Sequence, residues 1–121
     1  MQVRGMTWLG VRTPQLDETA AFFSTRLGMQ QKAKDPAKVV FSLPNGDTIE
    51  VFSADDPEHA HFTTGPVAGF LVDDVAAARQ ELQDAGVELL GTVMRDGGLE
   101  WAHFRGPDGH VYELTARTEE T

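Results

Sequence analysis

The chain contains no cysteine and no long hydrophobic run. Without cysteine it can form no disulfide, no thiolate nucleophile and no cysteine-ligated zinc site. Its apolar runs are only a few residues long, which is too short for a membrane-spanning helix. Positive charge is also scarce, because 10 lysines and arginines stand against 19 aspartates and glutamates, a formal net charge of −9. This balance excludes a surface built to bind nucleic-acid backbones.

The start of the sequence has no secretory pattern. MQVRGMTWLGVRT lacks both an apolar core and a small-residue cleavage site. We therefore expect a cytoplasmic protein whose partners include neither a membrane nor a nucleic acid. With 121 residues, 40% of them hydrophobic, the chain is long enough for one domain with its own core.

Hydrophobic periodicity predicts the same series of elements twice. In the first half we expect a strand, a helix capped by Asp17, a polar strand and a hairpin, over 6–13, 17–27, 30–35, 38–43 and 47–53. In the second half we expect a strand, a helix capped by Asp74, a strand and a hairpin, over 67–73, 74–85, 88–93, 99–105 and 110–116. The segment between the halves has no clear period.

Two segments of the sequence repeat one another. FSLPNGDTIEVF, from residue 41, aligns with FRGPDGHVYELT, from residue 104, and phenylalanine, proline, glycine and glutamate match at equal positions. The openings of the two halves align in the same way. We therefore expect a single domain over 1–121, made of two repeats at about 6–53 and 66–116 that a linker at 54–65 joins.

These motifs resemble the vicinal oxygen chelate superfamily, which contains glyoxalase I, bleomycin-resistance proteins and extradiol dioxygenases. The segments LGVRTPQLDETAAFFSTRLGM, FLVDDVAAARQELQDAGV and FRGPDGHVYEL carry the resemblance, which extends from about 6 to 116. It implies an α+β fold of two tandem βαβββ modules, whose curved mixed sheet surrounds a cavity with the helices outside. It also implies a homodimer, because members of this length commonly pair.

The resemblance further implies a divalent metal in the cavity, held by the first and last strands of each module. The matching positions in this chain are Trp8, Glu50, Val67 and Glu113. An indole has no free lone pair for a metal, and valine has no ligand atom. The two carboxylates alone fall short of the three protein ligands usual at a catalytic metal. We therefore expect no cofactor, and a divalent metal is disfavoured.

Strand alternation assigns one set of side chains to the face of the sheet that points away from the helices. If Gly106 pairs with His110 across the second turn, His103 lies opposite Glu113, and Trp101 lies opposite Thr115. The same register in the first hairpin puts valine at position 40 opposite Glu50. We expect the Glu113 carboxylate to raise the pKa of the imidazole. Such a pair could move a proton on a substrate, or it could serve as a structural pair.

Several side chains predicted for this face suit a ligand. Tryptophan rings hold planar or cationic molecules by stacking and cation–π contact, and the carboxylates call for a counter-charge. The candidate ligand-binding residues are Trp8, Arg12, Glu50, Phe52, Trp101, His103 and Glu113. The alternative is that the tryptophans fill a cavity that has lost its metal.

The linker contains a His-x-His pair, His59 and His61. Such a pair binds zinc when a third ligand is present. Because Asp55, Asp56 and Glu58 precede the pair, we expect a solvated loop instead.

Two functions follow from these residues. The first is a small-molecule-binding protein of the glyoxalase and bleomycin-resistance type, without the standard metal site, that takes a planar or cationic organic ligand in the sheet cavity. The second is a lyase, isomerase or dioxygenase-like enzyme that uses His103 and Glu113, an unorthodox divalent metal site being one form of it. In both, the expected partners are a small molecule and a second copy of the chain.

Overall fold

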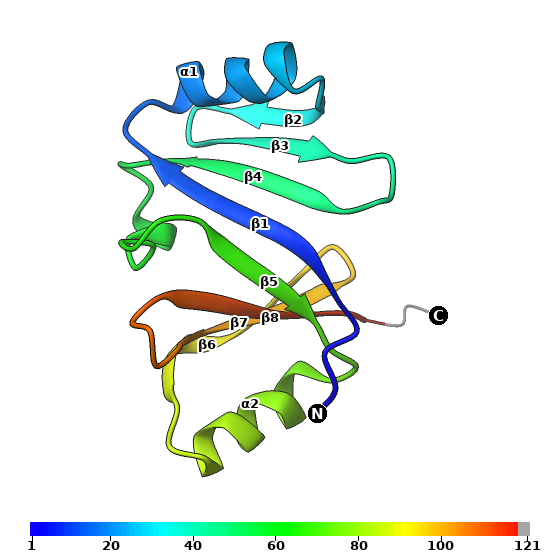
Figure 1. Ribbon diagram of the computed structural model, residues 1–121, viewed down its shortest axis with the longest axis vertical. Coiled ribbons are helices and arrows are strands. Elements are labelled where there is room, and N and C mark those ends of the chain that lie inside the picture. Colours follow the sequence, from blue (N-terminus) through cyan, green and yellow to red (C-terminus); the bar gives the residue numbers. More distant parts are fainter. Residues whose placement is uncertain (119–121) are drawn as a thin grey trace. The chain divides into compact units, whose positions relative to one another are not determined.

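The computed structural model describes residues 1–118 and contains the order βαβββ twice (Figure 1). The first set comprises β1 (Gly5–Thr13), α1 (Leu16–Ala21), β2 (Gln30–Asp35), β3 (Lys38–Ser42) and β4 (Thr48–Ser53). The second comprises β5 (Val67–Leu71), α2 (Val75–Asp84), β6 (Glu88–Asp96), β7 (Leu99–Arg105) and β8 (Val111–Arg117). The predicted α+β class with tandem βαβββ modules is confirmed.

The chain packs into two compact units. Thr7–Val67 form one, and Met1–Met6 form the other together with residues 68–118. We call them the N-terminal unit and the C-terminal unit.

The sheet of the N-terminal unit has the strand order β2-β3-β4-β1. β3 is antiparallel to β2 and β4, whereas β1 runs parallel to β4. Val40 lies opposite Glu50, as the turn register predicted. The β2–β3 ladder shifts register between Gln31 and Ala33, which marks a bulge in β2.

The core of this unit lies between α1 and the sheet. Side chains from both elements form one buried cluster, with further apolar residues packed around it. The buried members are Ala20, Val39, Phe41, Ile49 and Val51, and Leu9, Leu16, Phe23, Met29 and Leu43 surround them. Leu9, Ile49 and Val51 therefore lie on the face of the sheet that the helix covers.

The predicted cap of the first helix is wrong. α1 begins at Leu16, after Gln15, which makes no side-chain capping bond. Asp17 instead lies in the first turn, where its negative charge opposes the partial positive charge of the helix end. The helix continues beyond Ala21 as a π-helical turn over Phe22–Arg26, a widening that the apolar spacing does not reveal.

The sheet of the C-terminal unit has the order β5-β8-β7-β6. β5 runs parallel to β8, and the remaining pairs are antiparallel. The β6–β7 ladder shifts register between Leu90 and Met94. Asp74 caps α2 as predicted, because its Oδ1 accepts a hydrogen bond from the Ala77 N–H at 3.0 Å.

The core of this unit lies between α2 and its sheet. Val75 and Ala78 of the helix pack against apolar side chains of β7 and β8 and against Val72. The strand members of this cluster are Ala102, Leu114 and Ala116.

Paired glycines end equivalent hairpin turns in the two repeats. Gly46 and Gly109 have φ of 89° and 82°, in the left-handed region that only glycine adopts without strain. This requirement accounts for the glycine that both repeats share in the turn.

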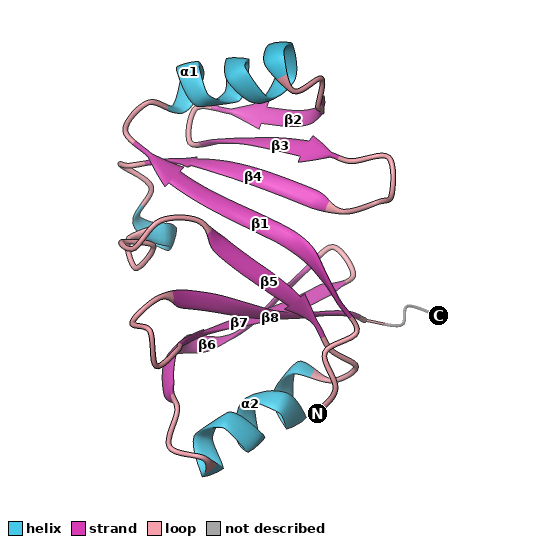
Figure 2. Ribbon diagram, in the orientation of Figure 1, coloured by secondary structure: helices cyan, strands magenta, loops and turns pink. Residues whose placement is uncertain are grey.

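The connector between β4 and β5 contains a short 3-10 helix, Pro57–His59 (Figure 2). The described part of the chain has no helix with the length and hydrophobicity needed to cross a membrane.

Candidate functional site

Glu50 and Glu113 occupy equivalent places in the two repeats. Each lies on the last strand of its repeat, paired with a glycine of the first strand. The partner is Gly10 for Glu50 and Gly69 for Glu113. The two glutamates therefore have the same backbone setting, and their differences come from neighbouring side chains.

The side chains next to Glu50 differ from those next to Glu113 on both neighbouring strands. Trp8 stands two residues before the first glycine, where the second repeat has Val67. On the other side, Val40 lies opposite Glu50, whereas His103 lies opposite Glu113. Each glutamate thus has one nitrogen-bearing neighbour, on the first strand in the N-terminal unit and on the third in the C-terminal unit.

In the N-terminal unit, Trp8 and Glu50 form a hydrogen bond. The indole Nε1–H donates to Glu50 Oε1 at 3.1 Å, and both side chains are partly buried. Among residues 1–118, the ion pairs do not include Glu50. The carboxylate therefore meets an N–H dipole but no protein cation.

Two phenylalanine rings pack against the Trp8 ring. Its centroid lies 6.3 Å from that of Phe52, and 6.2 Å from that of Phe62 in an edge-on arrangement. Phe52 and Phe62 are 1% and 3% exposed, whereas Trp8 keeps part of its surface open. The linker sequence gave no period that could have placed Phe62 in this cluster.

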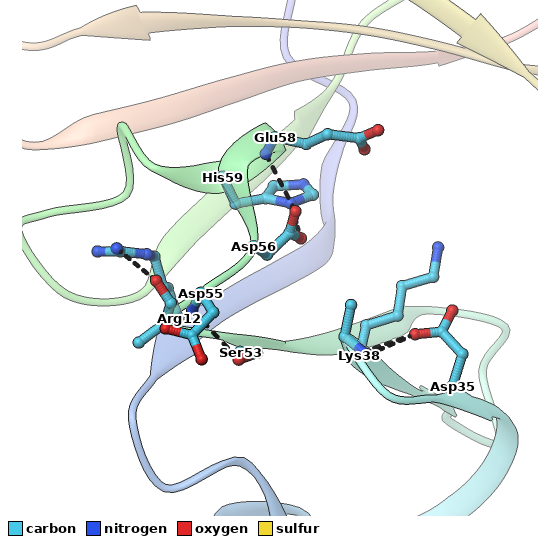
Figure 3. A network of polar contacts seen from close by, with 10 residues as sticks. Arg12, Asp35, Lys38, Ser53, Asp55, Asp56, Glu58 and His59 are labelled. Carbon is cyan, nitrogen blue, oxygen red and sulfur yellow. Dashed lines mark hydrogen bonds and ion pairs between the residues drawn. The ribbon is translucent and has the colours of Figure 1, made fainter.

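Arg12 lies further along β1, and its side chain is held by the connector. Its Nη2 donates to the Ala54 carbonyl at 2.8 Å (Figure 3). Within the described residues its buried Nε has no hydrogen-bond partner. Arg12 therefore does not neutralise Glu50.

The connector histidine His59 is more buried than the predicted solvated loop implies. Its side chain is 18% exposed and stacks on Phe52, with ring centroids 3.6 Å apart. Its Nδ1 lies 2.7 Å from Asp56 Oδ2, while Asp56 Oδ1 accepts from the Glu58 N–H at 3.0 Å (Figure 3). The expectation failed because an aromatic contact holds His59 against the strand.

Three connector side chains come close enough to share a metal ion, although they are not the predicted His-x-His pair. Ligand atoms of Asp56, Glu58 and His59 lie within 4.8 Å of one another, and His61 is not part of this set. Capping and the contact with His59 already use both Asp56 oxygens. This arrangement is therefore explained without a metal.

In the C-terminal unit, His103 and Glu113 lie side by side as the hairpin register predicted. The Gly106 N–H bonds to the His110 carbonyl at 2.9 Å, which fixes that register. His103 Nε2 lies 3.0 Å from Glu113 Oε1, and the side chains are 10% and 6% exposed. Trp101, two residues earlier on the same strand, lies opposite Thr115 as expected.

The predicted rise in the pKa of His103 is wrong, because the pKa is lowered instead. Burial lowers the pKa of His103 from 6.5 to about 4, because the imidazolium would lose its hydration inside the fold. At neutral pH the imidazole is therefore uncharged, and such an imidazole can accept a proton.

A family model now identifies the class of protein. The model of the Glyoxalase/Bleomycin resistance protein/Dioxygenase superfamily matches residues 5–114. The chain belongs to this superfamily. No curated protein matches it.

Solved structures share the fold at low sequence identity. Methylmalonyl-CoA epimerase from Mycobacterium tuberculosis has a TM-score of 0.70 and 19% identity, covering 97% of this chain and 90% of that one. The Mn(II)-bound glyoxalase from Novosphingobium aromaticivorans has a TM-score of 0.76 and 18% identity, covering 99% of this chain and 42% of that one. A superfamily member from Vibrio splendidus has a TM-score of 0.67 and 16% identity, covering 89% and 95%. These likenesses show the fold alone.

The residues at the positions that correspond to the family's metal ligands do not fit a metal. Trp8 and Val67 offer no lone pair to a cation. Trp8 also directs its N–H at Glu50 Oε1, so a hydrogen points at an oxygen that a metal would need. We therefore derive no chemical step through a metal ion.

Proposed function

We propose that this protein binds a small organic cation with a planar body, and that Trp8 and Glu50 make the contacts without a metal ion. The observation that carries the proposal is the 3.1 Å hydrogen bond from Trp8 Nε1 to Glu50 Oε1. It holds a carboxylate beside a partly open indole. The surface that results combines one negative charge with one flat aromatic ring.

The charge balance of Glu50 favours a cationic ligand. A partly buried carboxylate without a counter-charge is costly, and the described ion pairs leave Glu50 without one. Arg12, a cation on the neighbouring strand β1, donates to the Ala54 carbonyl instead. A bound organic cation would supply the missing charge, and its flat body would gain cation–π contact with the indole.

The second candidate is a lyase or isomerase that works by proton transfer at His103. The observation in its favour is the buried pair of His103 and Glu113, with 3.0 Å between Nε2 and Oε1 and a lowered imidazole pKa. In this proposal Glu113 orients the ring through Nε2, and Nδ1 takes a proton from the bound molecule and returns it. The epimerase and glyoxalase among the structural relatives make this chemistry worth testing.

The homodimer and the cytoplasmic location remain part of the proposal. They rest on the family resemblance and on the sequence. Sedimentation equilibrium of the purified chain tests the first, and cell fractionation of the natural host tests the second.

A matched pair of probes tests the binding function. 1-Methylquinolinium and 1-methylnaphthalene have the same shape and differ in charge. We expect the cation to shift the Trp8 indole N–H resonance, which the Trp101→Phe variant assigns, and Glu50→Gln to weaken its binding about tenfold. Equal binding of both probes, or a shift of the Trp101 resonance alone, would contradict the proposal.

Elemental analysis gives an independent test of the metal-free part. Protein purified without a histidine tag should carry less than one divalent ion per chain. One tightly bound ion per chain, lost in the Glu50→Gln variant, would overturn it.

A further inference from the structure

We infer that Gly10 is a positioning residue, which seats the Trp8 indole against Glu50 and thereby sets the affinity for the organic cation. The inference rests on the proposed binding function. Gly10 has no side chain with which to contact the ligand or the carboxylate, so it acts through the position of the Trp8 ring.

The Trp8 ring lies directly over Gly10. A Cβ added to Gly10 would stand 2.1 Å from Trp8 Cη2, 2.7 Å from Cζ3 and 2.8 Å from Cζ2. Real carbon contacts are about 3.5 Å or longer. Any residue other than glycine at position 10 must therefore displace the benzene half of the indole.

The backbone does not by itself require glycine here. Gly10 lies within β1 and is not among the glycines with positive φ. A glycine inside a strand is ordinarily unfavourable, because it adds backbone entropy to the unfolded chain and packs no side chain. Glycine at position 10 therefore serves to leave space for the Trp8 ring.

The pairing of strands links this space to Glu50. Gly10 and Glu50 are directly paired residues of β1 and β4. A ring that starts at Trp8 and lies across Gly10 therefore ends beside Glu50, where Nε1 donates its hydrogen. Phe52 and Phe62, both nearly fully buried, leave the ring no room to retreat in their direction.

The test uses Gly10→Ala in a Trp101→Phe background, so that Trp8 is the one remaining indole. Without ligand, we expect the Trp8 N–H resonance to move and the emission maximum to shift to longer wavelength as the ring leaves Glu50. With 1-methylquinolinium, we expect affinity to fall at least about tenfold relative to the Trp101→Phe parent. Unchanged Trp8 signals, or an unchanged affinity, would overturn the inference.

A double-mutant cycle separates seating from general damage to the strand. Gly10→Ala should lower the melting temperature when Trp8 is present, and should leave it unchanged or raise it in a Trp8→Ala background. An equal loss in both backgrounds would show that Gly10 does not act through Trp8, and would overturn the inference. The cycle and the ligand-free spectra need no ligand. If the unmodified chain binds neither probe, the proposed function is wrong. The cycle and the ligand-free spectra still test whether Gly10 positions the Trp8 ring.

Discussion

The imidazole of His103 and the carboxylate of Glu113 face each other across the β7–β8 ladder, with 3.0 Å between Nε2 and Oε1. Both side chains are almost completely buried, and that burial lowers the pKa of His103 to about 4. Protonating the imidazole is therefore harder in the folded chain than in the unfolded one. The consequences reach both stability and chemistry.

The first consequence is a loss of stability in mild acid. Between about pH 6.5 and pH 4 the unfolded chain binds the His103 proton and the folded chain does not, so the free energy of unfolding falls as the pH falls. The contribution is fully present above about pH 6.5, and its full size is about 3 kcal/mol. Urea unfolding across this range measures it. His103→Gln should flatten the dependence, and His110→Gln on the exposed turn should not; equal slopes in both variants would contradict the assignment.

The same pair gives a prediction for catalysis. If His103 transfers the proton, His103→Asn should abolish turnover of an identified substrate while the circular dichroism spectrum stays native. Glu113→Gln should reduce kcat and alter its pH profile, because the ring loses the carboxylate that orients it. Full turnover by folded His103→Asn protein would remove the enzyme candidate in this form.

The Trp8–Glu50 hydrogen bond predicts a measurable coupling. Trp8→Phe keeps an aromatic ring and removes the N–H, so the free energy of unfolding should fall by about 1–2 kcal/mol. A cycle with Glu50→Ala, which removes the acceptor oxygen, followed by urea unfolding, isolates the free energy of the Trp8–Glu50 contact from that of packing. Additive effects of the two substitutions would show that the bond contributes nothing in solution.

The chain has one tyrosine, which makes another contact easy to observe. The Tyr112 hydroxyl donates to the Asp108 carboxylate, and this bond raises the pKa of Tyr112 above 10.0 and lowers that of Asp108. Ultraviolet titration of the native chain should therefore show phenolate formation above pH 10.0, and Asp108→Asn should bring it back toward that value. Identical titrations of the two proteins would refute the contact.

Two adjacent aspartates give a matched test of helix capping. Asp74 accepts the Ala77 N–H, and its replacement by alanine should lower the free energy of unfolding by about 1 kcal/mol. Asp73 forms an exposed ion pair with Arg4, so Asp73→Ala should change stability little. Thermal denaturation compares them, and a larger loss for Asp73 would reverse the assignment.

The sequence predicted the register of both hairpins because short glycine turns fix it locally. The opposition of His103 to Glu113, and of Val40 to Glu50, followed from counting outward from those turns. What it could not predict depends on packing between distant segments. His59 stacks on Phe52 through a connector without a period, and the sign of the His103 pKa shift follows from burial rather than from its neighbour.

The sequence itself carries one signal for the position of the Trp8 ring. Residues i and i+2 of a strand share a face, so a glycine two residues after a tryptophan leaves room for the larger ring. Gly10 stands in that relation to Trp8. Whether the ring takes that room depends on Phe52 and Phe62, which the strand pattern does not place.

The irregular ladders at β2 and β6 bear on how the protein behaves when concentrated. Each strand ends the sheet of its unit, and each ladder shifts register once, at Gln31/Ala33 and at Leu90/Met94. β2 also exposes Lys32 and Lys34. Bulges interrupt the row of backbone amide groups that an incoming strand would need, and lysine charges on the edge oppose the pairing. Neither edge is therefore a template for fibril growth, and concentrated solutions should resist amyloid-like aggregation.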